Sequence, residues 1–201
     1  PEEFGAEGIA RHAAHEAVTH HDVKAVEYYI DDQLDAAADV LGGPTQLTDL
    51  KTLVHFACTS EDINNLSTAR CVKNAIEHVW LPGIDAIVDL LAARADEYGQ
   101  PATPTTLGKE LAVYVYRLRR QIAHVRTQQY LGKINGATGT FGAHLAAVDG
   151  VDWVEVSRVF VEDRMGLTWN PLTTQIESHD WQAELYGTIS HANRIMHNLC
   201  V

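Results

Sequence analysis

The sequence predicts an all-α protein whose long helices pack as a bundle. Apolar residues recur every three or four positions over long stretches, which is the spacing of an amphipathic helix. No stretch alternates apolar and polar residues in the manner of a half-buried strand. Glycine and proline mark the ends of the apolar stretches. The 201 residues, 46% of them hydrophobic, are enough for one sizeable core or two small ones.

Two helices are expected in the first half of the chain. One begins at Asp22 and loses its apolar spacing at residues 42–44, which read Gly-Gly-Pro. The next begins at Thr59 and Ser60 and reaches Pro82. Proline lacks the N–H of a helical hydrogen bond, but the apolar spacing resumes directly after it. We therefore expect Pro82 to kink this helix rather than end it.

Three further helices are expected in the second half. One begins at Thr103 and Pro104, because a capping residue followed by proline suits a first helical turn. Near-heptad apolar spacing behind this start is typical of a long bundle helix. Another begins at the capping box of Asp152–Glu155 and ends at Gly166. The last begins near His179.

Composition excludes several classes of partner. The formal net charge of −12 argues against nucleic acid or an anionic membrane as a partner. No apolar stretch approaches the ~20 residues that span a bilayer. Cys58, Cys71 and Cys200 are odd in number and too widely spaced for a disulfide framework or paired metal ligands. We expect them to be small buried residues of a cytoplasmic protein in a reducing compartment.

The polar cluster at residues 59–65, directly before a helical pattern, is the most informative motif. Thr59 and Asp62 have the spacing of a capping box, and such a helix start presents backbone N–H groups at the positive end of the helix dipole. The hydroxyls of Thr59 and Ser60 can donate as well, so the segment suits a carboxylate or a phosphate. The alternative is a cap that binds nothing, because capping-box matches are common.

Histidines form a second cluster. His20, His21 and Asp22 stand at the start of a predicted helix, where an imidazole could donate to an anion or transfer a proton. The alternative is a solvated or capping pair. A metal site would draw on His12 and His15 as well. Their spacing matches neither HExxH nor a zinc finger, so we expect no metal.

Three more polar residues lie in predicted loops. Lys133 and Asn135 place a cation and an amide on the glycine-rich loop 132–142, which lacks the Lys-Ser or Lys-Thr of a phosphate-binding loop. Gln175 precedes the last helix. Each is a weak signal alone, because a polar side chain in a loop is commonly just solvated.

Five segments of the chain together carry a family resemblance. They are HHDVKAVEYYI (20–30), HFACTSEDINNLS (55–67), GQPATPTTLGKE (99–110), LGKINGATGTF (131–141) and WNPLTTQIESHDWQAEL (169–185). In this order they resemble the bacterial branch of the adenylosuccinate lyase family, within the fumarase/aspartase superfamily. The motifs CTSEDINN and HDVKAVEY are the most specific part of the resemblance.

The resemblance implies a lyase of purine biosynthesis. The family releases fumarate from adenylosuccinate, and from the succinyl-carboxamide intermediate, by β-elimination without a cofactor. His21 would lie near the phosphate or the transferring proton as a catalytic residue. Thr59 and Ser60 would hold a succinyl carboxylate. The residues that would contact substrate are His20, His21, Asp22, Thr59, Ser60, Gln175, Lys133 and Asn135.

The sequence also departs from the family pattern. The Thr-x-x-His-Gly motif, whose histidine is the expected acid, is missing where Tyr98 meets Gly99, and His20 stands where an asparagine is usual. The flexible loop with the expected base serine does not occur before residue 201. We therefore expect the chain as given to be inactive alone.

The resemblance further implies the organisation of the protein. Residues 1–20 would end an N-terminal domain or form a lead-in helix. Residues 21–201 would form a truncated central helical-bundle domain, with the C-terminal domain absent. The superfamily assembles homotetramers with shared active sites, so we expect a cytoplasmic homo-oligomer acting on a small molecule. The alternatives are argininosuccinate lyase or fumarase, and a non-catalytic helical assembly module.

Overall fold

The computed structural model describes residues 4–43, 46–101 and 104–201, which form two compact units. Unit 1 comprises residues 1–64, 134–155 and 174–176, and unit 2 comprises the remaining segments, 65–133, 156–173 and 177–201. Nearly all regular structure is helical, which confirms the predicted all-α class. Among the described residues, no helix combines the length and the apolarity needed to cross a bilayer.

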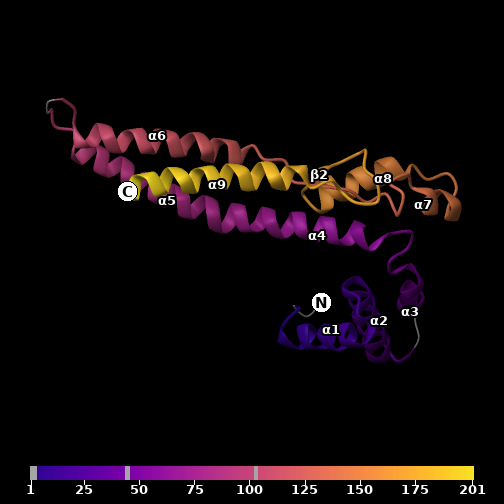
Figure 1. The fold of residues 1–201 in the computed structure, drawn as a ribbon. Coiled ribbons are helices and arrows are strands. Elements are labelled where there is room, and N and C mark those ends of the chain that lie inside the picture. The colour runs from indigo at the N-terminus through magenta and orange to yellow at the C-terminus, as the bar shows by residue number, and fades with distance from the viewer. Residues whose placement is uncertain (1–3, 44–45, 102–103) are drawn as a thin grey trace. The chain divides into compact units, whose positions relative to one another are not determined.

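Unit 1 contains the N-terminal helices of the chain and one short helix further along. They are α1 (Ala6–Thr19), α2 (Asp22–Val40), α3 (Gln46–Asp49), the 3₁₀ turn η1 (Leu50–Leu53) and α7 (Gly142–Ala147), shown in Figure 1. Helices α1 and α2 pack on one another, with Val23, Ala25 and Ala38 buried in α2. The predicted helix from Asp22 is confirmed. The predicted division at residue 20 concerns domains of a longer protein and stays a prediction.

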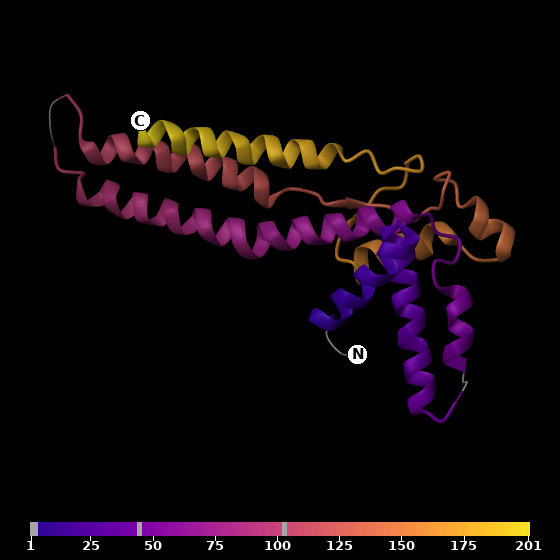
Figure 2. The same cartoon turned by 60° about the horizontal axis from the view of Figure 1, so that its bottom comes forward.

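Unit 2 contains three long helices that pack on one another. Helices α5 (Leu81–Glu97), α6 (Leu107–Arg126) and α9 (Asp180–Cys200) run alongside one another in Figures 1 and 2. The core between them is apolar and consists of Ile84, Val88, Val115, Leu118, Ile122, Ala192 and Ile195. These residues recur on one face of each helix. The apolar positions read from the sequence are therefore the ones that pack in the core.

Helix α4 (Ser60–Ala75) continues through the π-helix η2 (Ile76–Trp80) directly into α5. Pro82 is therefore accommodated within a continuous helical segment, and the prediction that it does not end the helix is confirmed. The irregularity is a widened π turn immediately before the proline, where the α-helical hydrogen-bond pattern changes.

Unit 2 also contains a pair of short parallel strands that the sequence did not predict. Leu131 of β1 (Leu131–Gly132) pairs with Thr168 of β2 (Thr168–Trp169). Two residues are too few for an alternating pattern to be recognised. Between them along the chain lie α8 (Trp153–Val159), whose residues fall in both units, and the π-helix η3 (Phe160–Arg164).

Two helix starts besides that of α4 were predicted from capping residues. Asp152 accepts a hydrogen bond from the backbone N–H of Glu155 (3.0 Å), as the capping box predicts. The start at Thr103–Pro104 is wrong as far as the structure describes it. Thr103 lies outside the described residues, and Pro104 precedes the helix. The actual cap is Thr106, whose hydroxyl accepts from the N–H of Lys109 (2.9 Å).

The burial predicted for the cysteines is wrong for two of them. Cys71 and Cys200 are exposed, and Cys58 is partly buried. Both exposed thiols lie on helices of unit 2, on faces that this chain does not cover. Apolar character alone does not tell which helix face is covered.

Candidate active site

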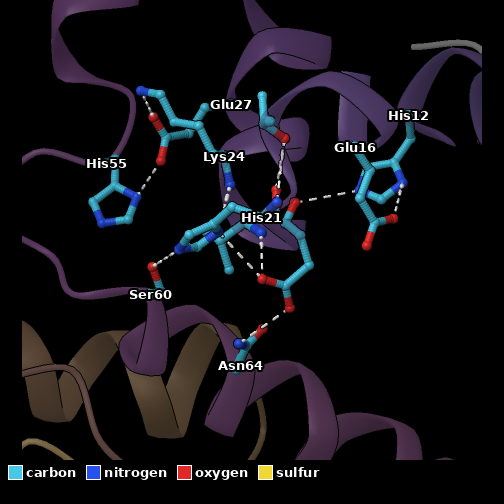
Figure 3. A network of polar contacts seen from close by, with 11 residues as sticks. His12, Glu16, His21, Lys24, Glu27, His55, Ser60 and Asn64 are labelled. Atoms are coloured by element: carbon cyan, nitrogen blue, oxygen red, sulfur yellow. Dashed lines mark hydrogen bonds and ion pairs between the residues drawn. The ribbon is translucent and has the colours of Figure 1, made fainter. Parts of the chain in front are cut away.

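A polar network in unit 1 joins the start of α2 to the start of α4 (Figure 3). Helix α1 ends at Thr19, and His20 turns the chain with a left-handed backbone (φ 52°). His21 then caps α2, because its Nδ1 accepts from the N–H of Lys24 (3.3 Å). The Thr19 hydroxyl donates to the carbonyl of His21 (3.1 Å). This tight turn holds the backbone of His21 on both sides.

His21 lies beside the predicted anion-binding segment. Its Nε2 is 3.4 Å from the hydroxyl oxygen of Ser60, which is 39 residues away in the sequence. An Nδ1 that accepts from Lys24 leaves the proton of a neutral ring on Nε2, so the ring donates to Ser60. The proton of the Ser60 hydroxyl then remains available to a ligand. The same Nδ1 also lies 3.3 Å from Oδ1 of Asp22.

Asp22 connects the same two helix starts. Its Oδ1 accepts from the N–H of Val23 (2.8 Å), and its Oδ2 accepts from the amide of Asn64 (3.4 Å). An acidic residue in a first helical turn is also stabilised by the helix dipole. Asp22 therefore caps the start of α2 and helps to hold it against the start of α4.

The helix start at Thr59 differs in detail from a full capping box. The N–H of Thr59 donates to Oδ2 of Asp62 (2.9 Å), which is one half of the box. The hydroxyl of Thr59 instead accepts from the amide of Gln175 (3.2 Å). The hydroxyl proton of Thr59 takes no part in this hydrogen bond. Gln175 thus contacts a predicted ligand-binding residue 116 positions away in the sequence.

The network includes a histidine that the sequence reasoning did not single out. His55 Nδ1 lies 2.6 Å from Oε1 of Glu27, and the other oxygen of Glu27 accepts from the Lys24 ammonium (2.6 Å). This bond raises the pKa of Lys24 above its ordinary value. His55 and Ala57 both adopt left-handed backbones (φ 68° and 56°) just before Thr59, a strain that often accompanies functional segments. The sequence feature that could have indicated His55 is its position next to the CTSEDINN motif.

The other predicted residues occupy different environments. His20 is exposed and serves the turn after α1. Asn135 is buried in unit 1 and donates its backbone N–H to Asp62 Oδ1 (3.1 Å). Lys133 belongs to unit 2 and is fully buried. Its backbone N–H and carbonyl both pair with the side chain of Asn65, at 2.8 and 3.1 Å.

The geometry suits binding of an anion and movement of a proton. Two hydroxyls, a helix start and an imidazole converge from segments 19–24 and 55–64. Within the described residues, no group of three or more His, Cys, Asp or Glu side chains is arranged to hold a metal ion. The expectation of a reaction without metal or cofactor stays a prediction.

Comparison with known proteins places the chain in a family. A family model described as "Lyase" matches residues 2–201. Adenylosuccinate lyase of Escherichia coli strain K12 is 44% identical over 203 residues, covering 96% of this chain and 43% of the relative. The enzymes of that name from Vibrio cholerae and Haemophilus influenzae are 42% and 41% identical over 90% and 96% of the chain, and 40% and 43% of their own lengths. The chain thus spans about two fifths of the length of these relatives, and it belongs to the lyase family.

Proposed function

We propose that this chain is part of an adenylosuccinate lyase, which releases fumarate from adenylosuccinate and from the succinyl-carboxamide intermediate of purine biosynthesis. The proposal rests on one observation above all: the similarity to relatives of that name extends over 90% or more of the chain. The convergence of His21 and Ser60 in unit 1 supports it independently.

The proposed reaction is a β-elimination. A base removes a proton beside a carboxylate, the C–N bond breaks, and an acid protonates the departing nitrogen. The transient species carries two negative charges on one carboxylate group, so donors aimed at that group before the reaction lower the barrier. The hydroxyls of Thr59 and Ser60 at the α4 start are suited to this role, with His21 beside them as the catalytic or phosphate-contacting residue.

The remaining predicted residues have graded roles in the proposal. Asp22 is proposed to contact substrate while it holds the start of α2 against α4, and Gln175 orients the Thr59 hydroxyl as well as contacting substrate. Lys133, Asn135 and His20 are proposed as substrate-binding residues by the family resemblance. The expected acid motif is not found where Tyr98 meets Gly99. We therefore propose that this chain binds and orients substrate, and that it does not catalyse the reaction alone.

A direct assay tests the proposal. The chain as given, and a full-length enzyme containing it, are incubated with adenylosuccinate, and fumarate release is followed by absorbance. We expect release by the full-length enzyme alone. Activity with argininosuccinate or malate instead would favour another member of the superfamily. Absence of any fumarate chemistry in the full-length protein would favour the non-catalytic assembly module.

Ser60→Ala tests the role of the hydroxyl in the full-length enzyme. A hydrogen bond to a charged group contributes about 1.5–3 kcal/mol, so we expect kcat/KM for adenylosuccinate to fall roughly 10- to 100-fold. Ser67→Ala, seven residues on and exposed on the same helix, is the matched control and should change little. Unchanged kinetics for Ser60→Ala would contradict the assignment of Ser60.

We also propose a cytoplasmic homo-oligomer, in the form of a tetramer with shared active sites. Exposed apolar side chains on α5 and α6 support this, with Leu90 at 60% and Tyr116 at 70% exposure. Contiguous apolar surface commonly marks an interface between protein chains. Sedimentation at micromolar concentration tests the proposal. A well-folded monomer would count against it.

A further inference from the structure

Asp62 is a fully buried carboxylate at the start of α4, within unit 1. It accepts three backbone hydrogen bonds. Its Oδ2 accepts from the N–H groups of Thr59 (2.9 Å) and Gly136 (3.0 Å), and its Oδ1 accepts from the N–H of Asn135 (3.1 Å). A buried carboxylate is costly unless such donors satisfy it. The three bonds therefore tie the helix start to a loop more than 70 residues further along the chain.

The loop is shaped to make this contact. Gly136 has a left-handed backbone (φ 79°), which glycine adopts without strain. A side chain added there would meet the carbonyl of Ala57 at 3.4 Å and the ring of His144 at 3.6 Å. The carbonyl of Asn135 accepts from the N–H of Phe141 (3.0 Å), which closes the loop on its other side. Two consecutive N–H groups are thereby directed at one carboxylate.

Charge alone makes Asp62 an unfavourable neighbour for an anion. A negative charge in the first turn of α4 opposes a carboxylate bound at Thr59 and Ser60. The imidazole of His144, which feels the charge of Asp62, is buried between Phe141 and Trp153. Burial lowers the pKa of His144, with the charge of Asp62 opposing the shift in part. The contribution of Asp62 that the structure supports is geometric, through its hydrogen bonds to the backbone of Thr59, Asn135 and Gly136.

We propose that Asp62 is a positioning residue of the site, which holds the Asn135–Gly136 backbone against the α4 start so that Thr59 and Ser60 present a preformed seat to a dicarboxylate. This inference rests on the proposed function for the identity of the ligand. It adds a residue that acts through Thr59 and the loop, without contact with the substrate.

Charge and geometry make opposite predictions for Asp62→Asn. The amide removes the negative charge, which by electrostatics alone would strengthen anion binding. It also replaces one acceptor oxygen by a donor that faces backbone N–H groups, which releases the loop. We expect the second effect to dominate, with fumarate affinity, measured by titration calorimetry on the full-length enzyme, weakened about tenfold.

Asp152→Asn is the matched control. Asp152, which lies in unit 1, also caps a helix by accepting a backbone N–H, but it is exposed and makes no hydrogen bond to residues 59–62 or 134–136 among the described residues. We expect unchanged fumarate affinity for this variant. Amide hydrogen exchange is the second readout, with Asn135 and Gly136 exchanging at least tenfold faster in Asp62→Asn and unchanged in Asp152→Asn.

Each result decides the question. Equal or tighter fumarate binding by a folded Asp62→Asn protein would overturn the inference. If that variant does not fold, Asp62→Glu decides: it keeps the charge but adds a methylene in a fully buried position, and unchanged affinity would overturn the inference. If the wild-type protein binds no fumarate, the proposed function fails. The exchange rates then still decide whether Asp62 holds the loop.

Discussion

Replacement of Asn65 by alanine tests how strongly one side chain holds the segment that carries Lys133. Asn65 is buried in α4, and its amide pairs with both backbone groups of Lys133, donating to the carbonyl (3.1 Å) and accepting from the N–H (2.8 Å). Both residues belong to unit 2. Because Lys133 is itself fully buried, water cannot replace the lost partners.

The magnitude follows from these contacts. Leaving a buried donor or acceptor unsatisfied costs about 1–3 kcal/mol, so the loss of both partners lowers the free energy of unfolding by about 2–6 kcal/mol. Asn64→Ala is the control, because it changes the same residue type one position earlier in the same helix. Its bond is to the exposed carboxylate of Asp22 at 3.4 Å, so we expect a cost of at most about 1 kcal/mol.

Urea denaturation followed by circular dichroism measures the free energy of unfolding of both variants. Alanine has a higher helix propensity than asparagine, and this gain is shared by the two variants and cancels in their comparison. The difference between them therefore reports the pairing with Lys133. Equal destabilisation by Asn64→Ala and Asn65→Ala would refute the reasoning.

Two further predictions concern the core and the pH dependence of stability. Leu118 is fully buried in the core of α5, α6 and α9, so Leu118→Ala should lower the free energy of unfolding by about 2–5 kcal/mol. Arg120 is exposed, so Arg120→Ala should change it by no more than about 0.5 kcal/mol. Equal shifts in melting temperature for the two variants would contradict this packing. The pKa of His144 lies below its ordinary value of 6.5, so the unfolded chain takes up the proton first as pH falls. Its contribution to stability is complete above pH 6.5 and is lost as pH falls toward the folded-state pKa. His144→Phe, which keeps an aromatic ring beside Trp153, should reduce this pH dependence in urea titrations, and an unchanged slope would exclude His144 as its source.

The parts of the fold that sequence reasoning predicted are those with local causes. The starts of α2 and α4, the continuation past Pro82 and the Asp152 cap all depend on residues within one or two helical turns. The failures have non-local causes. The strand pair of Leu131 with Thr168 joins segments distant in sequence, and the exposure of Cys71 depends on which helix face a neighbour covers.

The candidate site divides in the same way. The sequence singled out His21, Thr59 and Ser60, because a helix start displays its donors whatever surrounds it. It did not predict that Gln175 donates to Thr59 or that Glu27 faces His55. The roles of the predicted residues toward a substrate remain predictions, and the experiments above test them.

The sequence by itself determined the helical class, the family and the helix starts at which an anion could bind. Only the tertiary structure decided what each polar group near those starts does. Asp62 reads as half of a capping box in the sequence, yet in the folded protein it also holds the backbone of Asn135 and Gly136. The reason is physical: a cap is satisfied within one helical turn, whereas a buried carboxylate must find its remaining donors wherever the chain brings them.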